Sequence, residues 1–128
     1  MSETLTAAQY REVTKQERHG RIPRAPKSRR TVGNIVFDSL AEAKRYQVLK
    51  LAEIAGRISN LTLQPKYALI CNGTHVGTYY ADFEYLNETG LLIVEDVKSA
   101  HTRKDPVYRL KKKMVLAIYG IEIKEVMQ

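Results

Sequence analysis

Residues 80–85 and 93–98 form two short alternating segments whose acidic residues and lysine are spaced for one kind of chemistry. Asp82 lies on the first segment, and Asp96 and Lys98 lie on the second. Such alternation predicts two strands of a hairpin, with the carboxylates and the ammonium on one face. Carboxylates about 5 Å apart repel each other unless a cation or a proton lies between them. Mg²⁺ or Mn²⁺ would relieve this repulsion, so these residues predict metal-dependent phosphodiester hydrolysis.

The register of this hairpin decides which carboxylates meet. A hairpin centred on Thr89 places Asp82 opposite Asp96, whereas one centred between residues 88 and 89 places Asp82 opposite Glu95. Sliding a strand by one residue exchanges its two faces, so the residues alone leave both registers open. The first register would also pair Tyr80 with Lys98 and Glu84 with Val94.

The composition of the 128-residue chain, with 44% apolar and 27% charged residues, is typical of one soluble globular domain. No apolar run approaches the roughly 18 residues of a membrane span, and no signal peptide is recognisable. We therefore expect a cytoplasmic protein without a membrane partner. Cys71 sits in an apolar run and is expected to be buried. Scattered histidines argue against a histidine metal site, and the lack of a glycine-rich phosphate loop argues against a nucleotide cofactor.

Positive charge is concentrated near the N-terminus. Residues 1–34 carry eight basic and three acidic residues, and the whole chain has a net charge of +7. Few apolar residues and several helix breakers predict a partly disordered arm, although residues 5–18 have a weak helical pattern. Such an arm is suited to lying along DNA phosphates, and the alternative is a tail that only maintains solubility. Its candidate contacts are Arg24, Lys27, Arg29 and Arg30.

Residues 35–128 predict one α/β domain that begins with a clear helix. This helix is expected to run from Ser39 to Ala55, because Ser39 and Glu42 form a capping-box pattern and Gly56 supplies a stop.

The rest of the domain predicts a mixed β-sheet. Short turns between the first strands favour an antiparallel meander. A helix over residues 107–119 and a strand over residues 121–126 follow. This helix is long enough for a crossover, so the last strand is expected to run parallel to the third. The result is a sheet flanked by helices in the order α-β-β-β-α-β. The three strands of the meander are expected at residues 66–71, 76–86 and 91–98.

These residues and elements resemble the PD-(D/E)XK nuclease superfamily, whose pattern is an acidic residue on one strand and acid-any-lysine on the next. The matching residues are Asp82 and Asp96-Val97-Lys98, with Ala81 at a position where that family often has proline. Five sequence blocks more closely resemble a phage-borne family of small endonucleases and Holliday junction resolvase-like proteins within it. The blocks are residues 37–42, 63–66, 81–83, 95–98 and 105–111.

The resemblance implies a restriction-endonuclease-like core and selects the register that pairs Asp82 with Asp96. It implies that these carboxylates and the Val97 carbonyl bind the metal, with Lys98 beside the attacking water. Related nucleases also place a helix glutamate at the metal, which implies a catalytic and metal-binding role for Glu42. The capping box offers the alternative that Glu42 only caps its helix.

Basic residues around the second helix are candidate DNA contacts. Lys111 falls within the apolar stripe of that helix, where a lysine either extends to solvent or points at an anion, and we expect a phosphate contact. Gln64 is a candidate for approaching the metal, with a turn role before Pro65 as the alternative. The outer backbone contacts are expected to be Arg103, Lys104, Arg109, Lys112 and Lys113.

The sequence therefore predicts a metal-dependent DNA endonuclease of phage or mobile-element type, acting in the cytoplasm of the host cell. Small size without a separate reading domain favours branched DNA, such as a Holliday junction, in phage recombination, replication or packaging. Symmetric cutting of two strands would require a homodimer, which the sequence permits. A non-catalytic nucleic-acid-binding protein on the same fold is the second hypothesis, and a structural or assembly protein of a virus is the third.

Overall fold

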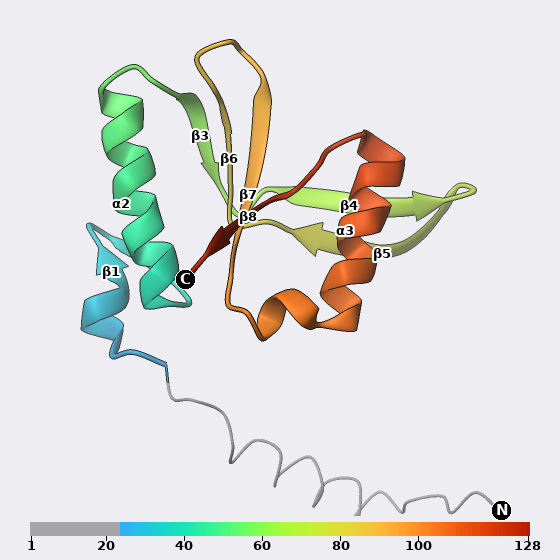
Figure 1. Cartoon of the computed structure of the whole chain (residues 1–128), viewed down its shortest axis with the longest axis horizontal. Coiled ribbons are helices and arrows are strands. Elements are labelled where there is room, and N and C mark those ends of the chain that lie inside the picture. Colours follow the sequence, from blue (N-terminus) through green and yellow to red (C-terminus); the bar gives the residue numbers. More distant parts are fainter. Residues whose placement is uncertain (1–23) are drawn as a thin grey trace, which may run out of the picture.

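Two helices lie on opposite sides of a four-stranded mixed sheet, and α3 packs mainly against a separate hairpin, labelled β4 and β5 in Figure 1. The structure is a computed structural model that describes residues 24–128. Helix α2 packs against one face of the sheet and helix α3 against the other, so each face has its own apolar core. The α/β class expected from the sequence is confirmed. The helices span Leu40–Ile54 for α2 and Pro106–Tyr119 for α3.

The central sheet has the strand order β3-β6-β7-β8. Strands β3 and β7 are antiparallel to β6, and β8 runs parallel to β7. The parallel return of the last strand, through the crossover helix α3, is therefore confirmed. The helices and the central sheet alone follow the order α-β-β-β-α-β, but β4 and β5 come between β3 and β6, and β3 is not one of the three strands expected. The strands are β3 Ser59–Leu63, β6 Phe83–Leu86, β7 Leu92–Lys98 and β8 Lys124–Met127.

Strands β4 (Lys66–Cys71) and β5 (Thr74–Tyr80) form a separate antiparallel hairpin that projects beside α3 (Figure 1). The expected three-strand meander is therefore wrong in two respects. Its first strand is β4 of this hairpin, whereas β3 takes the place beside β6. Its second strand is broken at Ala81 and Asp82, so Tyr80 pairs with Lys66 and not with Lys98.

Main-chain hydrogen bonds explain the break between β5 and β6. Gln64 N–H donates to the Asp82 carbonyl at 2.9 Å, and Ala81 N–H donates to the Pro65 carbonyl at 3.1 Å. These bonds join residues 64–65, which lead into the hairpin, to residues 81–82, which lead out of it, at the base of the hairpin. Gln64 has a φ of 48°, which turns the chain sharply before the proline.

Local capping sets the start of each helix. The Ser39 hydroxyl accepts a hydrogen bond from Glu42 N–H at 3.1 Å, which confirms Ser39 as the N-cap of α2. The Asp105 carboxylate does the same for α3 by accepting from Val107 N–H at 2.9 Å. Helix α3 ends where Gly120 adopts a left-handed φ of 69°, as its glycine predicts.

The described part of the N-terminal region is folded onto α2. It contains the short helix η1 (Lys27–Arg30) and a two-stranded hairpin of β1 (Thr31–Val32) and β2 (Ile35–Val36). The Arg30 guanidinium donates to the carbonyls on either side of this unit, at residues 25 and 37. The expected boundary between arm and domain, at residue 34, falls within the β1–β2 hairpin. Residues 1–23, with the helix expected at 5–18, lie outside the described residues.

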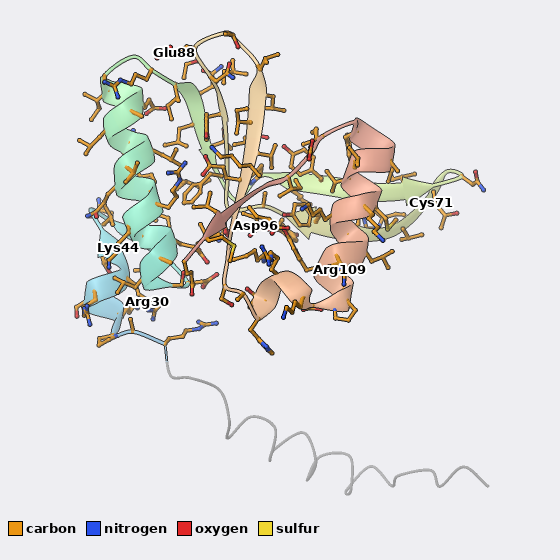
Figure 2. All side chains as sticks on the ribbon, in the orientation of Figure 1. Arg30, Lys44, Cys71, Glu88, Asp96 and Arg109 are labelled. Carbon is orange, nitrogen blue, oxygen red and sulfur yellow. The ribbon has the colours of Figure 1, made fainter. Side chains whose placement is uncertain are left out.

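The β4–β5 hairpin carries Cys71, which is exposed at its far end (Figure 2). The expectation that Cys71 is buried is wrong, because its apolar run belongs to a hairpin that extends away from the core. Within residues 24–128, neither α2 nor α3 combines the length and the apolar character needed to cross a bilayer.

Candidate active site

The hairpin of β6 and β7 brings Asp82 and Asp96 together. Phe83 pairs with Glu95, which centres the hairpin on Thr89 and confirms that register. The neighbouring pair expected from it, Glu84 with Val94, is also present. Extending the ladder by one step places Asp82 opposite Asp96, on the face that α3 covers. The alternative pairing of Asp82 with Glu95 is excluded.

Asp82 is held at the point where the chain enters β6. Its main-chain N–H donates to the Glu95 carbonyl at 3.1 Å, and its Oδ2 accepts from Val97 N–H at 2.7 Å. The carboxylate therefore reaches across the neighbouring strand towards Asp96. Burial raises the pKa of Asp82, and the negative charges of Asp96 and Glu42 raise it further.

Asp96 lies near the centre of the molecule and is only 3% exposed (Figure 2). Its Oδ2 accepts a hydrogen bond from the Tyr79 hydroxyl on β5, and its Oδ1 lies 3.3 Å from Lys98 Nζ. Lys98 Nζ also lies 4.4 Å from the ring centroid of Tyr108 on α3, at cation–π distance. The lysine is thus fixed beside the carboxylates rather than extended into solvent.

Glu42 reaches the same site from the first turn of α2. The Ser39 hydroxyl accepts from Glu42 N–H, but among the described residues the Glu42 carboxylate makes no hydrogen bond to the Ser39 N–H. The reciprocal bond of a full capping box is therefore missing, although the Ser39 side chain lowers the pKa of the Glu42 carboxyl. Burial raises the pKa of Glu42, followed by the charges of Asp38 and Asp96. The positive charge of Lys98 lowers the pKa of Glu42. Glu42 and Asp82 therefore both lie within range of the Asp96 charge.

The donor set suits a hard cation that needs few protein ligands. Within residues 24–128, no three histidine, cysteine, aspartate or glutamate side chains converge closely enough to form a complete metal shell. Mg²⁺ is commonly bound through one or two carboxylates with waters and substrate phosphates completing its shell. Asp82 and Asp96 meet that requirement, and their mutual repulsion is the charge imbalance a cation would relieve. The Val97 contact observed here is its N–H on Asp82.

Lys111 and Gln64 have other contacts than those expected. Lys111 Nζ donates to the Thr78 carbonyl of β5 at 2.9 Å, which joins α3 to the projecting hairpin and accounts for a lysine in an apolar stripe. Gln64 is exposed and takes the turn role, with its N–H on the Asp82 carbonyl.

The other expected DNA contacts fall into two groups. Near η1, Arg24 lies 3.9 Å from Asp38, and Arg30 is occupied by main-chain carbonyls. Near α3, Lys112 and Arg103 both lie against Glu125, at 2.7 Å and 3.9 Å. Within residues 24–128, the exposed members that form no ion pair are Lys27, Arg29, Lys104, Arg109 and Lys113.

Two tyrosines of the site, Tyr79 and Tyr108, were not expected. The uninterrupted strand predicted for residues 76–86 would have placed Tyr79 on the face opposite Asp82. The break at Ala81 changes that parity and lets the Tyr79 hydroxyl reach Asp96. Tyr108 could have been found from its place in the first turn of the helix that follows the Asp96 strand.

A buried network behind the site was also missed. Glu95 is fully buried on the α2 face, where its two oxygens accept from the Arg45 guanidinium at 2.7 and 2.9 Å. The Tyr85 hydroxyl donates to the same carboxylate, and burial with this bond raises the pKa of Tyr85 to about 12. This network ties α2 to β7, one residue from Asp96.

Comparison with known proteins gives a family without an assigned activity. The model of the family described as "Protein of unknown function (DUF1064)" matches residues 24–126, most of the chain. No curated protein and no solved structure matches the chain. The chain belongs to the DUF1064 family.

Proposed function

We propose that this DUF1064 protein is a metal-dependent DNA endonuclease that hydrolyses phosphodiester bonds with Mg²⁺ or Mn²⁺. The observation that carries the proposal is that Asp82, Asp96 and Lys98 lie together where β6 begins and β7 ends, with Glu42 near enough on α2 for its pKa to respond to Asp96 and Lys98. Burial and neighbouring carboxylates raise the pKa of Asp82 and of Glu42, and groups with such perturbed pKa values concentrate at functional sites. A purely structural sheet has no need of them.

The arrangement of elements supports a restriction-endonuclease-like core. The order α2, β3, β6, β7, α3, β8 and the placement of an acidic residue and acid-any-lysine on neighbouring strands agree with the PD-(D/E)XK resemblance. In this proposal the β4–β5 hairpin is an insertion between β3 and β6.

Each residue has a separate task in the proposed reaction. Asp82 and Asp96 would hold the metal, with the Val97 carbonyl and Glu42 as further ligands. When bound, the metal supplies polarisation of the phosphoryl oxygen and a lower pKa for the attacking water. Lys98, fixed between Asp96 and the Tyr108 ring, would orient that water and neutralise developing negative charge.

The surroundings of the site suit a nucleic-acid backbone. Helices α2 and α3 both begin on the side of the molecule that carries η1 and the short helix η2 (Thr102–Lys104) (Figure 1). Helix N-termini and basic side chains both favour phosphate. We propose branched DNA as the substrate, in phage recombination, replication or packaging, with a homodimer wherever two strands are cut symmetrically.

The test compares cleavage of a four-way junction, a flap, a bubble and a linear duplex in Mg²⁺ and in Mn²⁺. Asp82→Asn and Lys98→Ala should abolish cutting while largely retaining DNA affinity measured in EDTA. Lys44→Ala, which removes an exposed lysine on α2, is the matched control and should cut normally. Failure of the wild-type protein to cut all four DNAs in both metals would overturn the proposal.

A non-catalytic DNA-binding protein is the second candidate. The observation that favours it is that Tyr79 and Lys98 already satisfy the Asp96 carboxylate. If this candidate holds, Asp96→Asn should leave DNA binding unchanged, and added Mg²⁺ should not raise the melting temperature of the wild type.

A further inference from the structure

A pocket of about 420 Å³ lies beside the candidate active site, between η2, α3 and the chain that enters β8. Its lining contains five basic and two acidic side chains, so the pocket carries an excess of positive charge. The volume lies in the range of sites that bind small molecules. The acidic members are Glu122 and Glu125.

The basic side chains of the pocket divide into paired and unpaired groups. Lys112 and Arg103 lie against Glu125, whose pKa is lowered mainly by Lys112 in spite of partial burial. Within residues 24–128, the other three form no ion pair. These exposed cations are Lys104, Arg109 and Lys113. They are available to an anion from outside the chain.

Aliphatic side chains complete the pocket. Leu116, Ile121 and Ile123 contribute to its lining, and Leu116 is half exposed. An inorganic phosphate would not contact this apolar surface favourably. A nucleotide would place its phosphate against the cations and its base against the aliphatic side chains.

The pocket is directly connected to the candidate active site. Glu125 in its wall is the register partner of Asp96 on the neighbouring strand, and adjacent strands lie about 4.8 Å apart. Tyr108 stands between the two sites, with its ring under Lys98 and its hydroxyl donating to Glu125 at 3.2 Å. A DNA strand that presents a phosphate at Asp96 would therefore have a neighbouring nucleotide within reach of the pocket.

We propose that this pocket binds one unpaired nucleotide of a DNA strand, with Arg109 and Lys113 on its phosphate and Leu116 against its base. The inference rests on the proposed function, and it names the feature of branched DNA that would be recognised. A base paired within a duplex is not available to such a pocket, whereas a base next to a branch or in an overhang is.

The experiment measures binding in EDTA, where metal-dependent cutting does not interfere. The probes are a fluorescein-labelled duplex with a single-stranded overhang, the same duplex with abasic overhang positions, and a blunt duplex. Arg109→Ala/Lys113→Ala should weaken binding to the overhang DNA about tenfold or more. The slope of its salt dependence should fall by about 0.7 for each single-strand phosphate that the variant no longer neutralises.

The matched control is Lys44→Ala/Arg57→Ala, which removes one exposed lysine and one exposed arginine far from the pocket lining. It should leave overhang binding within about twofold of the wild type. Leu116→Ala should weaken binding of the overhang with bases about threefold, and leave the abasic overhang unchanged. Far-UV circular dichroism and thermal melting of each variant check that it is folded.

Two outcomes would overturn the proposal that this pocket binds an unpaired nucleotide. One is an equal loss of affinity for blunt and overhang DNA in the Arg109→Ala/Lys113→Ala variant, which would make these cations general duplex contacts. The other is a loss of affinity no larger than that of the Lys44→Ala/Arg57→Ala control. Cleavage is a separate readout: a protein that binds overhangs through the pocket but never cuts would overturn only the nuclease proposal. A protein that cuts but fails the binding test would overturn only the pocket.

Discussion

At the scale of single residues, the three carboxylates of the candidate site differ in the number of hydrogen-bond and ion-pair partners that each has. Asp96 has a tyrosine and a lysine, Asp82 has one main-chain N–H, and Glu42 has no complete cap. The carboxylates therefore outnumber the cations in a partly buried site, where an unpaired negative charge is costly for stability. Such an arrangement lowers stability and is typical of functional sites.

The first prediction concerns Asp82→Asn and pH. The pKa of Asp82 is raised above its ordinary value of 3.8, so the folded protein holds this proton more tightly than the unfolded chain does. Its stabilising contribution is complete below pH 3.8 and is lost as the pH rises through the raised pKa. In EDTA, the wild type should therefore lose stability between about pH 4 and about pH 8, and Asp82→Asn should lose less. Urea unfolding at several pH values measures this, and parallel curves would contradict it.

The second prediction concerns the buried partner of Glu95. Replacing Arg45 by methionine leaves a fully buried carboxylate without its cation and should cost about 3–5 kcal/mol of unfolding free energy. The double variant Arg45→Met/Glu95→Gln removes the charge as well, so it should recover much of this loss. Urea unfolding of the two variants checks the expectation. Equal stabilities would show that the ion pair contributes little.

At the scale of elements, the helices and both hairpins follow from local signals, whereas strand β3 and the break between β5 and β6 were not predicted. Ser39 and Gly120 mark helix ends by their own chemistry, whereas the residues around Thr89 left two registers open, and the family resemblance selected the one observed. Strand β3 alternates only over its last four residues, 60–63, and this short pattern was not recognised as a strand. The break at Ala81 depends on hydrogen bonds from residues 64 and 65, which no local pattern contains.

The third prediction concerns Lys111 as a link between elements. Lys111→Met keeps the apolar stem but removes the hydrogen bond to the Thr78 carbonyl, so unfolding free energy should fall by about 1 kcal/mol. The salt dependence of duplex binding should not change. A decrease in its slope of about 0.9 would instead identify Lys111 as the phosphate contact that the sequence suggested.

At the scale of the whole molecule, the positions of the site residues were more predictable than their surroundings. The acid-any-lysine spacing, with the register that the family resemblance selected, brought Asp82, Asp96 and Lys98 together before the fold was known. Tyr79 and the Arg45–Glu95 pair were not predictable, because each joins residues from elements that meet only in the folded chain. The cations of the pocket were predicted one by one, but not that they share a pocket with aliphatic side chains.

The fourth prediction concerns the first 23 residues, which add Arg11, Lys15, Arg18 and Arg21 to the chain. Deleting them should weaken DNA binding, with the slope of the salt dependence falling by about 0.9 for each duplex phosphate that the shortened chain no longer neutralises. The melting temperature should stay the same, since the family match begins at residue 24. Fluorescence anisotropy at several salt concentrations measures the change. An unchanged slope would show that this segment does not contact phosphates.

The base of the β4–β5 hairpin is bonded to the same residues that form the candidate site. Gln64 holds the Asp82 main chain, and the Tyr79 hydroxyl holds Asp96. The far end of the hairpin carries the only cysteine of the chain, Cys71, which is exposed. The hairpin is thus bonded to the candidate site at its base and carries a natural labelling position at its far end. A single dye on Cys71 would convert a small shift of Asp82 and Asp96 on metal binding into an optical signal, without a change to any other residue.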